Sequence, residues 1–315
     1  MSSIVSNNTR STVSVATLGW KSLPPEYAIP LQAPGLSAAQ EYCRRLARSH
    51  YENFSVASWF LPQPLRQHFF NVYAYCRISD DLGDEVGNQA ASLQLLDQWE
   101  SELHACYSGI PRHPVFVALA ETVRRFEIPQ QTFADLLTAF RQDQRVNRYE
   151  TFADLLGYCR YSANPVGHLV LYVCGYRDAE HQALSDCTCT ALQLANFWQD
   201  VSVDYAKGRI YLPMEDLRRF HVSEQDIAAQ RNTAEFCDLM RFEVDRARDW
   251  FERGLGLIEK VDRELAIDIE LFSRGGQEVL NAIEAQGFNV LGRRPAISKA
   301  RKLALVARAA CRRVL

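Results

Sequence analysis

Two groups of acidic residues at helical spacing constrain the fold of this chain more than any other feature. Asp80 and Asp84 follow an aromatic run, residues 69–75, whose composition is compatible with a helix. If that helix continues, side chains four residues apart project from the same face. Like charges at this spacing repel each other, and the repulsion grows where the carboxylates are shielded from water. The pair therefore predicts either a solvated helix face or the binding site of a cation.

The second group consists of Asn196, Asp200 and Asp204, which recur every four residues, so that one helix face would carry three oxygen ligands. The apolar residues Phe197 and Trp198 lie between them. Two such faces, on helices far apart in sequence, can oppose each other across the core of a helical bundle. Each group alone is typical of a solvated surface, but the two together favour a functional site.

The two groups predict a magnesium site. Mg²⁺ prefers hard oxygen ligands and is usually held by one or two carboxylates together with substrate phosphates and water. Bound between the two faces, it would neutralise charge on a departing diphosphate and so assist cleavage of the C–O bond. The carbocation left behind needs a dry pocket with aromatic walls. Candidate wall residues are Phe54, Tyr73, Tyr158, Leu169 and Phe197.

Two arginines are placed to bind the same anion. Arg77 lies three residues before Asp80 on the same predicted face, and Arg209 lies in segment 208–213, which we expect to be extended. A guanidinium group binds a carboxylate or a phosphate through paired hydrogen bonds. Further basic residues are concentrated between residues 293 and 313. This stretch predicts a solvated helix face, a lid over an anionic substrate or contact with an anionic membrane surface, and the sequence leaves these alternatives open.

Several other functional classes find no support in the sequence. A nucleophilic serine motif and a glycine-rich dinucleotide fingerprint are both absent. The net charge of −3 gives no reason to expect a nucleic-acid partner. Nine cysteines without a regular framework indicate reduced thiols and hence a cytoplasmic protein. No apolar run approaches the roughly 18–20 residues of a spanning helix, so we expect a soluble protein, with peripheral contact to the inner face of the cytoplasmic membrane left open.

The pattern along the chain predicts an all-α, single-domain helical bundle around a central cavity. Strand alternation is almost absent, and apolar residues recur at helical spacing between short connections. Residues 1–35 are rich in Ser, Thr, Asn and Pro and are predicted to form a flexible arm, with the helical domain spanning residues 36–315. The predicted helices span about 36–49, 54–60, 64–84, 91–107, 114–126, 130–144, 151–174, 179–203, 214–219, 223–230, 233–262, 265–286 and 295–313.

One of these helices, residues 151–174, contains Pro165 and Gly167. A proline inside a helix removes a backbone hydrogen bond and clashes with the preceding turn, so the helix should kink there. In a bundle such a kink lets the helix bow around a cavity. A simple break of the helix at this point is the alternative.

Four motifs stand out along the chain: Cys76-Arg77 with Asp80-Asp81-x-x-Asp84, Gly157-Tyr158-Cys159, Gln193-x-x-Asn196-x-x-x-Asp200-x-x-x-Asp204, and Gly208-Arg209-x-Tyr211-x-Pro213. With these motifs the chain resembles the squalene/phytoene synthases over residues 38–305. The resemblance implies the isoprenoid synthase fold, Mg²⁺ as cofactor, and chemistry on C15 or C20 prenyl diphosphates.

The resemblance also implies roles for individual residues. Magnesium and diphosphate would be bound by Asp80, Asp84, Asn196, Asp200 and Asp204. Phosphate would be contacted by Arg77, Arg209 and Tyr211, while Tyr158 and Gln193 would lie near the reacting carbons. The segment with His50, Tyr51 and Phe54 corresponds to the family's N-terminal substrate-contacting segment, where the family usually has Ser in place of Tyr51 and Asn53.

Within the family, residues 80–85, 161–167 and 196–201 are most similar to the hydroxysqualene synthases of bacterial hopanoid gene clusters, which also carry the name squalene synthase. This similarity implies a carbon–oxygen lyase that ionises presqualene diphosphate, releases pyrophosphate and captures the rearranged cation with water. Such an enzyme would be coupled to a presqualene diphosphate synthase. Alternatives are head-to-head condensation of two farnesyl diphosphates to presqualene diphosphate, squalene or dehydrosqualene, a non-catalytic assembly protein of the same fold, and a helical module that binds a partner through its basic tail.

Overall fold

The computed structural model describes residues 23–49 and 63–314, and every regular element in these ranges is a helix. The predicted all-α fold is therefore confirmed, while the expected helix at 54–60 lies outside the described residues. Two short 3-10 segments are η2 (Pro25–Tyr27) and η3 (Leu255–Glu259). The α-helices are α1 (Leu36–Ser49), α3 (Gln63–Asp84), α4 (Gln89–Tyr107), α5 (Pro114–Phe126), α6 (Gln130–Asp143), α7 (Phe152–Ser162), α8 (Asn164–Val173), α9 (Ala179–Gln199), α10 (Val201–Ala206), α11 (Met214–Arg219), α12 (Glu224–Ala228), α13 (Ala234–Gly254), α14 (Arg263–Ala285) and α15 (Lys299–Val314).

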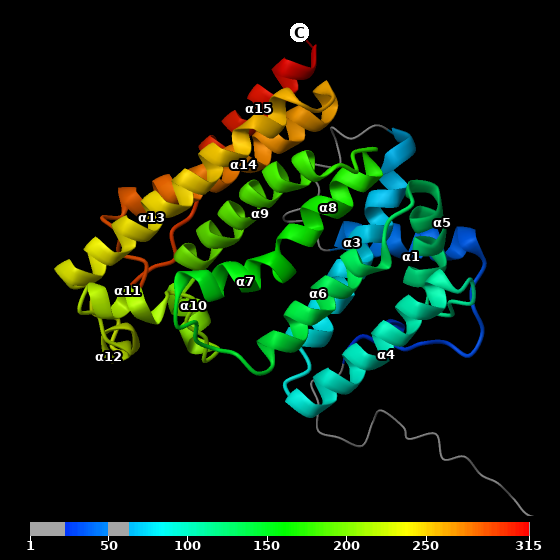
Figure 1. Ribbon diagram of the computed structural model, residues 1–315, viewed down its shortest axis with the longest axis horizontal. Helices are drawn as coiled ribbons and strands as arrows, with labels where there is room; N and C mark the ends of the chain where they lie inside the picture. The colour runs from blue at the N-terminus through cyan, green and yellow to red at the C-terminus, as the bar shows by residue number, and fades with distance from the viewer. Residues whose placement is uncertain (1–22, 50–62, 315) are drawn as a thin grey trace, which may run out of the picture.

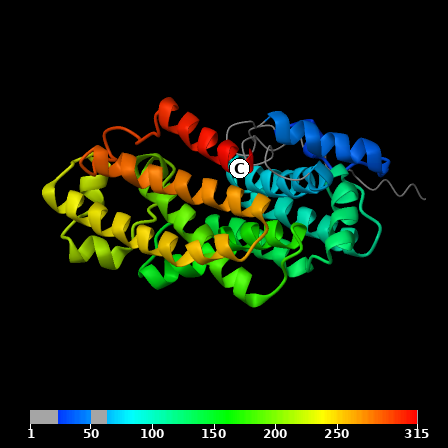
Figure 2. The ribbon, with the colours of Figure 1, turned by 90° about the horizontal axis from the view of Figure 1, so that it is seen from above.

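The bundle has two halves, each with its own hydrophobic core. Figure 1 shows α1 and α3 to α6 grouped on one side and α9 to α13 on the other. Trp99 and Phe116 are buried in the first core, and Trp198 and Phe236 in the second. Helices α13 and α14 both pack against α9, and Figure 2 shows α15 lying along the outer side of α14. Among the described helices, none is both long and apolar enough to cross a membrane.

Helix α3 carries the first acidic group on an amphipathic surface. Ile78 and Leu82, four residues apart, are buried in the first core. The side chains of Asp80 and Asp84 keep 50% and 24% of their surface exposed. Burial of the apolar face fixes the rotation of the helix, so both carboxylates project from its partly exposed face.

The second acidic group does not lie on one continuous helix, so the prediction of a single helix over residues 179–203 is wrong at this point. Asp200, with φ −106° and ψ 14°, separates α9 from α10. Its N–H still donates to the carbonyl of Asn196 at 3.0 Å, and the N–H of Asp204 donates to the carbonyl of Asp200 at 2.8 Å. The three residues therefore remain on successive turns. Asp is a weak helix former, and its carboxylate is bound outside the helix by Arg294, so the tertiary contact overrides the local pattern.

The predicted kink near Pro165 is a break between two helices. Ala163, with φ −114° and ψ −49°, separates α7 from α8, and Pro165 lies in the first turn of α8, where no backbone N–H is required. Gly167 then allows α8 to approach α9 closely. A Cβ atom at this position would lie 2.6 Å from Sγ of Cys189 and closer still to Oγ of Ser185.

The expected N-terminal arm, residues 1–35, is described only from Leu23 onward. This part contains η2, whose Tyr27 is buried and donates a hydrogen bond from its hydroxyl to Oδ2 of Asp81 at 2.6 Å. The segment before α1 thus contacts the acidic helix α3 directly.

Candidate active site

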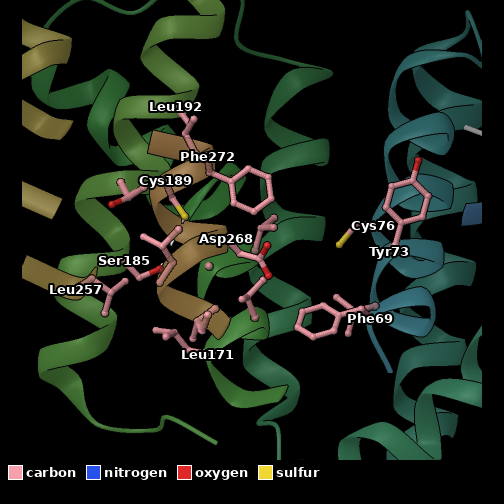
Figure 3. A pocket seen from close by; sticks show the side chains of 17 residues that line it. Phe69, Tyr73, Cys76, Leu171, Ser185, Cys189, Leu192, Leu257, Asp268 and Phe272 are labelled. Atoms are coloured by element: carbon pink, nitrogen blue, oxygen red, sulfur yellow. Dashed lines mark hydrogen bonds between the residues drawn. The ribbon is translucent and has the colours of Figure 1, made fainter. Parts of the chain in front are cut away.

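An apolar cavity of about 410 Å³ lies between the two halves of the bundle (Figure 3). Cys76 of α3 and Leu192 of α9 both line it, and each stands one helical turn before an acidic group, at Asp80 and Asn196 respectively. The acidic groups therefore lie at one end of the cavity. The described lining residues are Phe69, Val72, Tyr73, Cys76, Val166, Gly167, Val170, Leu171, Ser185, Thr188, Cys189, Leu192, Leu257, Leu265, Asp268, Ile269 and Phe272.

Arg209 links the two acidic groups. Its Nη2 donates to Oδ1 of Asp84 at 2.8 Å, and its Nη1 donates to Oδ2 at 3.3 Å. Nζ of Lys207 lies 3.7 Å from the same carboxylate. Both basic residues follow α10, the helix that carries Asp204. The segment after α10 therefore reaches α3, and the two groups share one site.

Burial and mutual repulsion raise the pKa values of two of these carboxyl groups. Burial raises the pKa of Asp80 to about 6, and the neighbouring Asp84 adds to the effect. Burial likewise raises the pKa of Asp204 to about 7, with a further contribution from Asp200. Crowded carboxylates of this kind are stabilised by a nearby cation. The donor set consists of hard oxygen atoms, which fits Mg²⁺.

The described side chains do not form a complete metal site by themselves. Within residues 23–49 and 63–314, no three His, Cys, Asp or Glu side chains converge on one metal position. Mg²⁺ commonly takes only one or two carboxylates and fills its remaining positions with phosphate oxygens and water. The residues present therefore fit an ion that arrives with a diphosphate.

Arg294, in the connection between α14 and α15, binds the Asp200 carboxylate. Its Nη2 lies 2.9 Å from Oδ2 of Asp200, its Nε contacts Oδ1, and Nη2 also donates to Oε1 of Gln199 at 3.1 Å. The side chain of Asp200 is 12% exposed and that of Arg294 is 53% exposed. In the sequence Arg294 was only one of many basic residues near the C-terminus. Its place at the site follows from the path of the chain after α14.

Asp143 is a member of the site that the sequence reasoning missed. It ends α6, and its Oδ2 accepts a hydrogen bond from the hydroxyl of Tyr158 at 3.0 Å. Its Oδ1 is buried and has no hydrogen-bond partner among the residues that the structure describes. Burial raises the pKa of Asp143 to about 7, Arg209 opposes this shift, and Asp84 and Asp80 reinforce it. A single Asp among Arg and Gln residues gave no sequence signal for this position.

Aromatic rings pack beside this end of the cavity. Phe197 and Tyr211 stack with their ring centroids 3.8 Å apart, and Tyr158 lies 6.2 Å from Phe197. Tyr149 also stacks on Tyr211, with the ring centroids 5.8 Å apart. Burial raises the pKa values of Tyr158 and Tyr211, so both hydroxyls remain protonated. Tyr158, Phe197 and Leu169 were expected as cavity walls, but they are buried in the two cores, and of that set Tyr73 lines the cavity.

Asp81 positions Arg77 beside the first acidic group. Nε of Arg77 donates to Oδ2 of Asp81 at 3.1 Å, and a second guanidinium nitrogen contacts Oδ1. Nη1 of Arg77 lies 3.7 Å from Oδ2 of Asp80. The expected pairing of Arg77 with a carboxylate is thus made mainly to Asp81, which is 5% exposed.

The remaining predicted residues divide into two sets. Gln193 and Asn196 stand on the last two turns of α9, with Gln193 half-buried and Asn196 exposed. The predicted substrate contacts His50, Tyr51 and Phe54 lie outside the described residues.

A helical bundle with an apolar cavity that ends between two acidic groups defines an enzyme with the isoprenoid synthase fold. Its family follows from the sequence. A model of the squalene/phytoene synthase family matches residues 47–301, and the chain belongs to this family, which acts on prenyl diphosphates in isoprenoid biosynthesis.

Comparison with known structures and sequences gives the same family. The crystal structure of squalene synthase HpnC from Alicyclobacillus acidocaldarius is 47% identical, covers 81% of this chain and 96% of its own, and superposes with a TM-score of 0.77. A dehydrosqualene synthase in complex with a ligand is 28% identical, covers 88% of this chain and 96% of its own, and has a TM-score of 0.80. The 15-cis-phytoene synthase of Synechocystis sp. is 32% identical, over 90% of this chain and 91% of its own.

Proposed function

We propose that this protein releases pyrophosphate from presqualene diphosphate and captures the rearranged carbocation with water to give hydroxysqualene, as a lyase of hopanoid biosynthesis. The observation that carries the proposal is the Arg209–Asp84 contact, which brings both acidic groups to one end of an apolar cavity. Chemistry of the squalene type is supported by the 47% identity to the HpnC squalene synthase, against 32% to the phytoene synthase. Capture of the cation by water rests on the resemblance of residues 80–85, 161–167 and 196–201 to hydroxysqualene synthases.

Binding of the diphosphate is assigned to the polar end of the cavity. The magnesium ligands would be Asp80, Asp84, Asn196, Asp200 and Asp204, and the bound metal would supply charge neutralisation to the departing pyrophosphate. Arg209 and Lys207 stand beside Asp84, and Arg77 stands beside Asp80. These three cations would contact phosphate oxygens and orient the leaving group away from the cavity.

The rest of the cavity would hold the hydrocarbon chains and the cation. Its apolar walls exclude bulk water, which would otherwise capture the cation at random. Of the aromatic residues expected as walls, Tyr73 lines the cavity, and its ring would stabilise positive charge there. Tyr158 and Phe197 pack in the core beside the acidic end. The hydroxyl of Tyr158 is held by Asp143, which fixes the ring. His50, Tyr51, Phe54, Gln193 and Tyr211 complete the proposed substrate contacts.

Head-to-head condensation of two farnesyl diphosphates is the second candidate reaction. It is favoured by the phytoene synthase and dehydrosqualene synthase relatives. A non-catalytic assembly protein of the same fold is a third candidate, although both acidic groups stand intact in this chain.

Two incubations of purified protein with Mg²⁺, one with presqualene diphosphate and one with farnesyl diphosphate, distinguish these functions. Pyrophosphate release and product masses are then measured. We expect hydroxysqualene from presqualene diphosphate and no product from farnesyl diphosphate alone. Turnover of farnesyl diphosphate would favour condensation, and a lack of pyrophosphate release from either substrate would favour the assembly role.

The location of the enzyme is proposed to be cytoplasmic, with the basic helix α15 against the inner face of the membrane. Lys299, Arg301, Lys302 and Leu303 are all exposed near its N-terminal end. Such a surface combines positive charge with an apolar side chain, which suits an anionic bilayer. Substrate would then come from a presqualene diphosphate synthase working at the same membrane. Sedimentation with vesicles containing anionic lipid tests this contact, and loss of binding in 1 M salt is expected.

A further inference from the structure

The apolar cavity contains one buried carboxyl group that has no part in diphosphate binding. Asp268 of α14 is 2% exposed and lines the cavity beside Ile269 and Phe272. Figure 3 shows its carboxylate pointing into the cavity. Among the described lining residues, Asp268 is the only one with a carboxyl group. The described part of this apolar interior therefore includes a carboxyl group that can accept a proton.

Asp268 lines the same cavity in which the cation would form. It shares the cavity with Cys76, which stands one helical turn, or about 5.4 Å, before Asp80. A substrate whose diphosphate is bound at Asp80 extends its first carbons past Cys76 into the cavity. In a cyclopropylcarbinyl diphosphate these carbons become the cation when the C–O bond breaks. The positive charge then arises in the same space that Asp268 faces.

We infer that Asp268 holds the water molecule that captures the cation and accepts its proton. The inference rests on the proposed formation of hydroxysqualene. The leaving pyrophosphate has already taken the electron pair of the broken C–O bond. A lone pair of the water oxygen then forms the new C–O bond, one O–H bond of the water breaks, and the proton passes to a carboxylate oxygen of Asp268. The product is a neutral alcohol.

The acceptor character of a carboxylate explains why it would direct the reaction. An ionised Asp accepts hydrogen bonds and donates none. A water molecule bound to it must turn its hydrogens toward Asp268, which leaves an oxygen lone pair directed away from α14 and into the cavity. General-base assistance of this kind contributes roughly 10²–10⁴-fold to a proton transfer. Without it, the cation would more often lose a proton and give a hydrocarbon.

Substitutions of Asp268 separate capture of water from loss of pyrophosphate. D268N keeps the shape of the side chain but cannot take the proton, and D268S leaves room for a water without a base. Each variant is incubated with Mg²⁺ and presqualene diphosphate in ¹⁸O-labelled water, and pyrophosphate, labelled alcohol and hydrocarbon products are measured. We expect pyrophosphate release to stay within about threefold of wild type, while the alcohol fraction falls at least about tenfold.

Two further variants control for the substitution itself. E264Q makes the matching acid-to-amide change at an exposed position one turn earlier on α14, and its products should match wild type. D268E retains the carboxyl group and should keep the alcohol as the main product. Circular dichroism melting establishes that each variant is folded.

Four results would overturn the inference. The first is an unchanged alcohol fraction in D268N and D268S, and the second is hydrocarbon as the main product of D268E. The third is a loss of pyrophosphate release in D268N and D268S as large as their loss of alcohol. The fourth is failure of D268N and D268S to fold, which would mean that the carboxyl group serves the stability of the fold. If the wild-type protein makes no alcohol, the proposed function itself is refuted, and this inference is refuted with it before any variant is compared.

Discussion

Arg294 and Asp200, 94 residues apart in the chain, form a two-contact ion pair across the acidic end of the cavity. Asp200 is a proposed magnesium ligand, so an arginine occupies part of the position that the metal would use. A metal ion and this arginine must then compete for one carboxylate. The C-terminal connection is in this way coupled to binding at the site.

Replacement of Arg294 should therefore strengthen metal binding in the absence of substrate. The side chain of Arg294 is 53% exposed, and a pair of this kind contributes at most about 1 kcal/mol, or about fivefold in affinity. R294Q is expected to bind Mg²⁺ about two- to fivefold more tightly by isothermal titration calorimetry. R293Q is a suitable control, because Arg293 contacts Gln286 rather than an acidic ligand. Equal Mg²⁺ affinities in R294Q and wild type would speak against the competition.

Arg209 should be important for release of pyrophosphate. It makes two hydrogen bonds to Asp84 and is 18% exposed, so it sits in a partly dry part of the site. Removal of a preorganised cation from such a site typically lowers kcat about 10²–10³-fold. R209Q is expected to show this loss in a pyrophosphate assay. K207Q should lose less, because Nζ of Lys207 lies 3.7 Å from Asp84 and is more exposed. Similar activity in R209Q and wild type would refute the assignment.

The stability of the metal-free protein should fall as pH rises from about 4 to 7. The pKa of Asp143 is raised to about 7 by burial, well above the roughly 3.9 of an unfolded Asp. The folded state therefore binds more protons in this range, so the stabilising effect is complete below about pH 4 and is lost as pH rises through 7. Asp80 and Asp204, with pKa values of about 6 and 7, act in the same direction.

The variant D143N isolates the contribution of one of these groups. Asn does not ionise, so D143N should be more stable than wild type at pH 8, and the difference should shrink toward pH 4. Urea unfolding at several pH values measures this trend. D135N makes the same change two turns earlier on α6, where Asp135 accepts an exposed hydrogen bond from Gln131. Its stability difference from wild type should not depend on pH in this way. A constant difference between D143N and wild type across the pH range would contradict the expectation.

Gly167 should be required for the close contact of α8 and α9. A Cβ atom there would approach Sγ of Cys189 to 2.6 Å, so G167A must displace the side chains of Ser185 and Cys189 or the helix that carries them. Overpacking of this kind costs about 1–3 kcal/mol, which urea unfolding can detect. G157A is the matched control, because nothing lies within 4 Å of a Cβ at Gly157 in α7 and Ala is the better helix former. Equal stabilities of G167A and wild type would show that the helices adjust freely.

Local patterns were sufficient to predict most helices. The ends of α5 were predicted correctly because Pro114 favours a first helical turn and apolar residues then recur at helical spacing. The rotation of α3 was predicted for the same reason, since the buried face determines where Asp80 and Asp84 project. The interruption at Asp200 was not predictable, because it accompanies a contact with a residue on a distant connection.

The composition of the site was only partly readable from the chain. Repeated acidic residues at helical spacing gave a signal for both groups. Arg209 was predicted to bind an anion because it lies in the expected extended segment 208–213, directly after the second acidic group. Asp143 and Asp268 gave none, because each is a single acidic residue whose importance depends on which side chains the fold brings beside it. Periodicity identifies faces of helices, but the position of a cavity depends on how those faces are packed together.

Tyr27 gives the N-terminal segment a part in the alignment of the reaction centre. Its hydroxyl holds the same Asp81 oxygen that receives Nε of Arg77. A chain that began after Ala28 would retain every helix from α1 onward, yet its Asp81 would lose one of the two groups that immobilise it. Arg77 would then sample more orientations next to Asp80. The segment predicted as a flexible arm would thus help to hold Arg77 in place beside Asp80, and its removal would slow turnover without unfolding the protein.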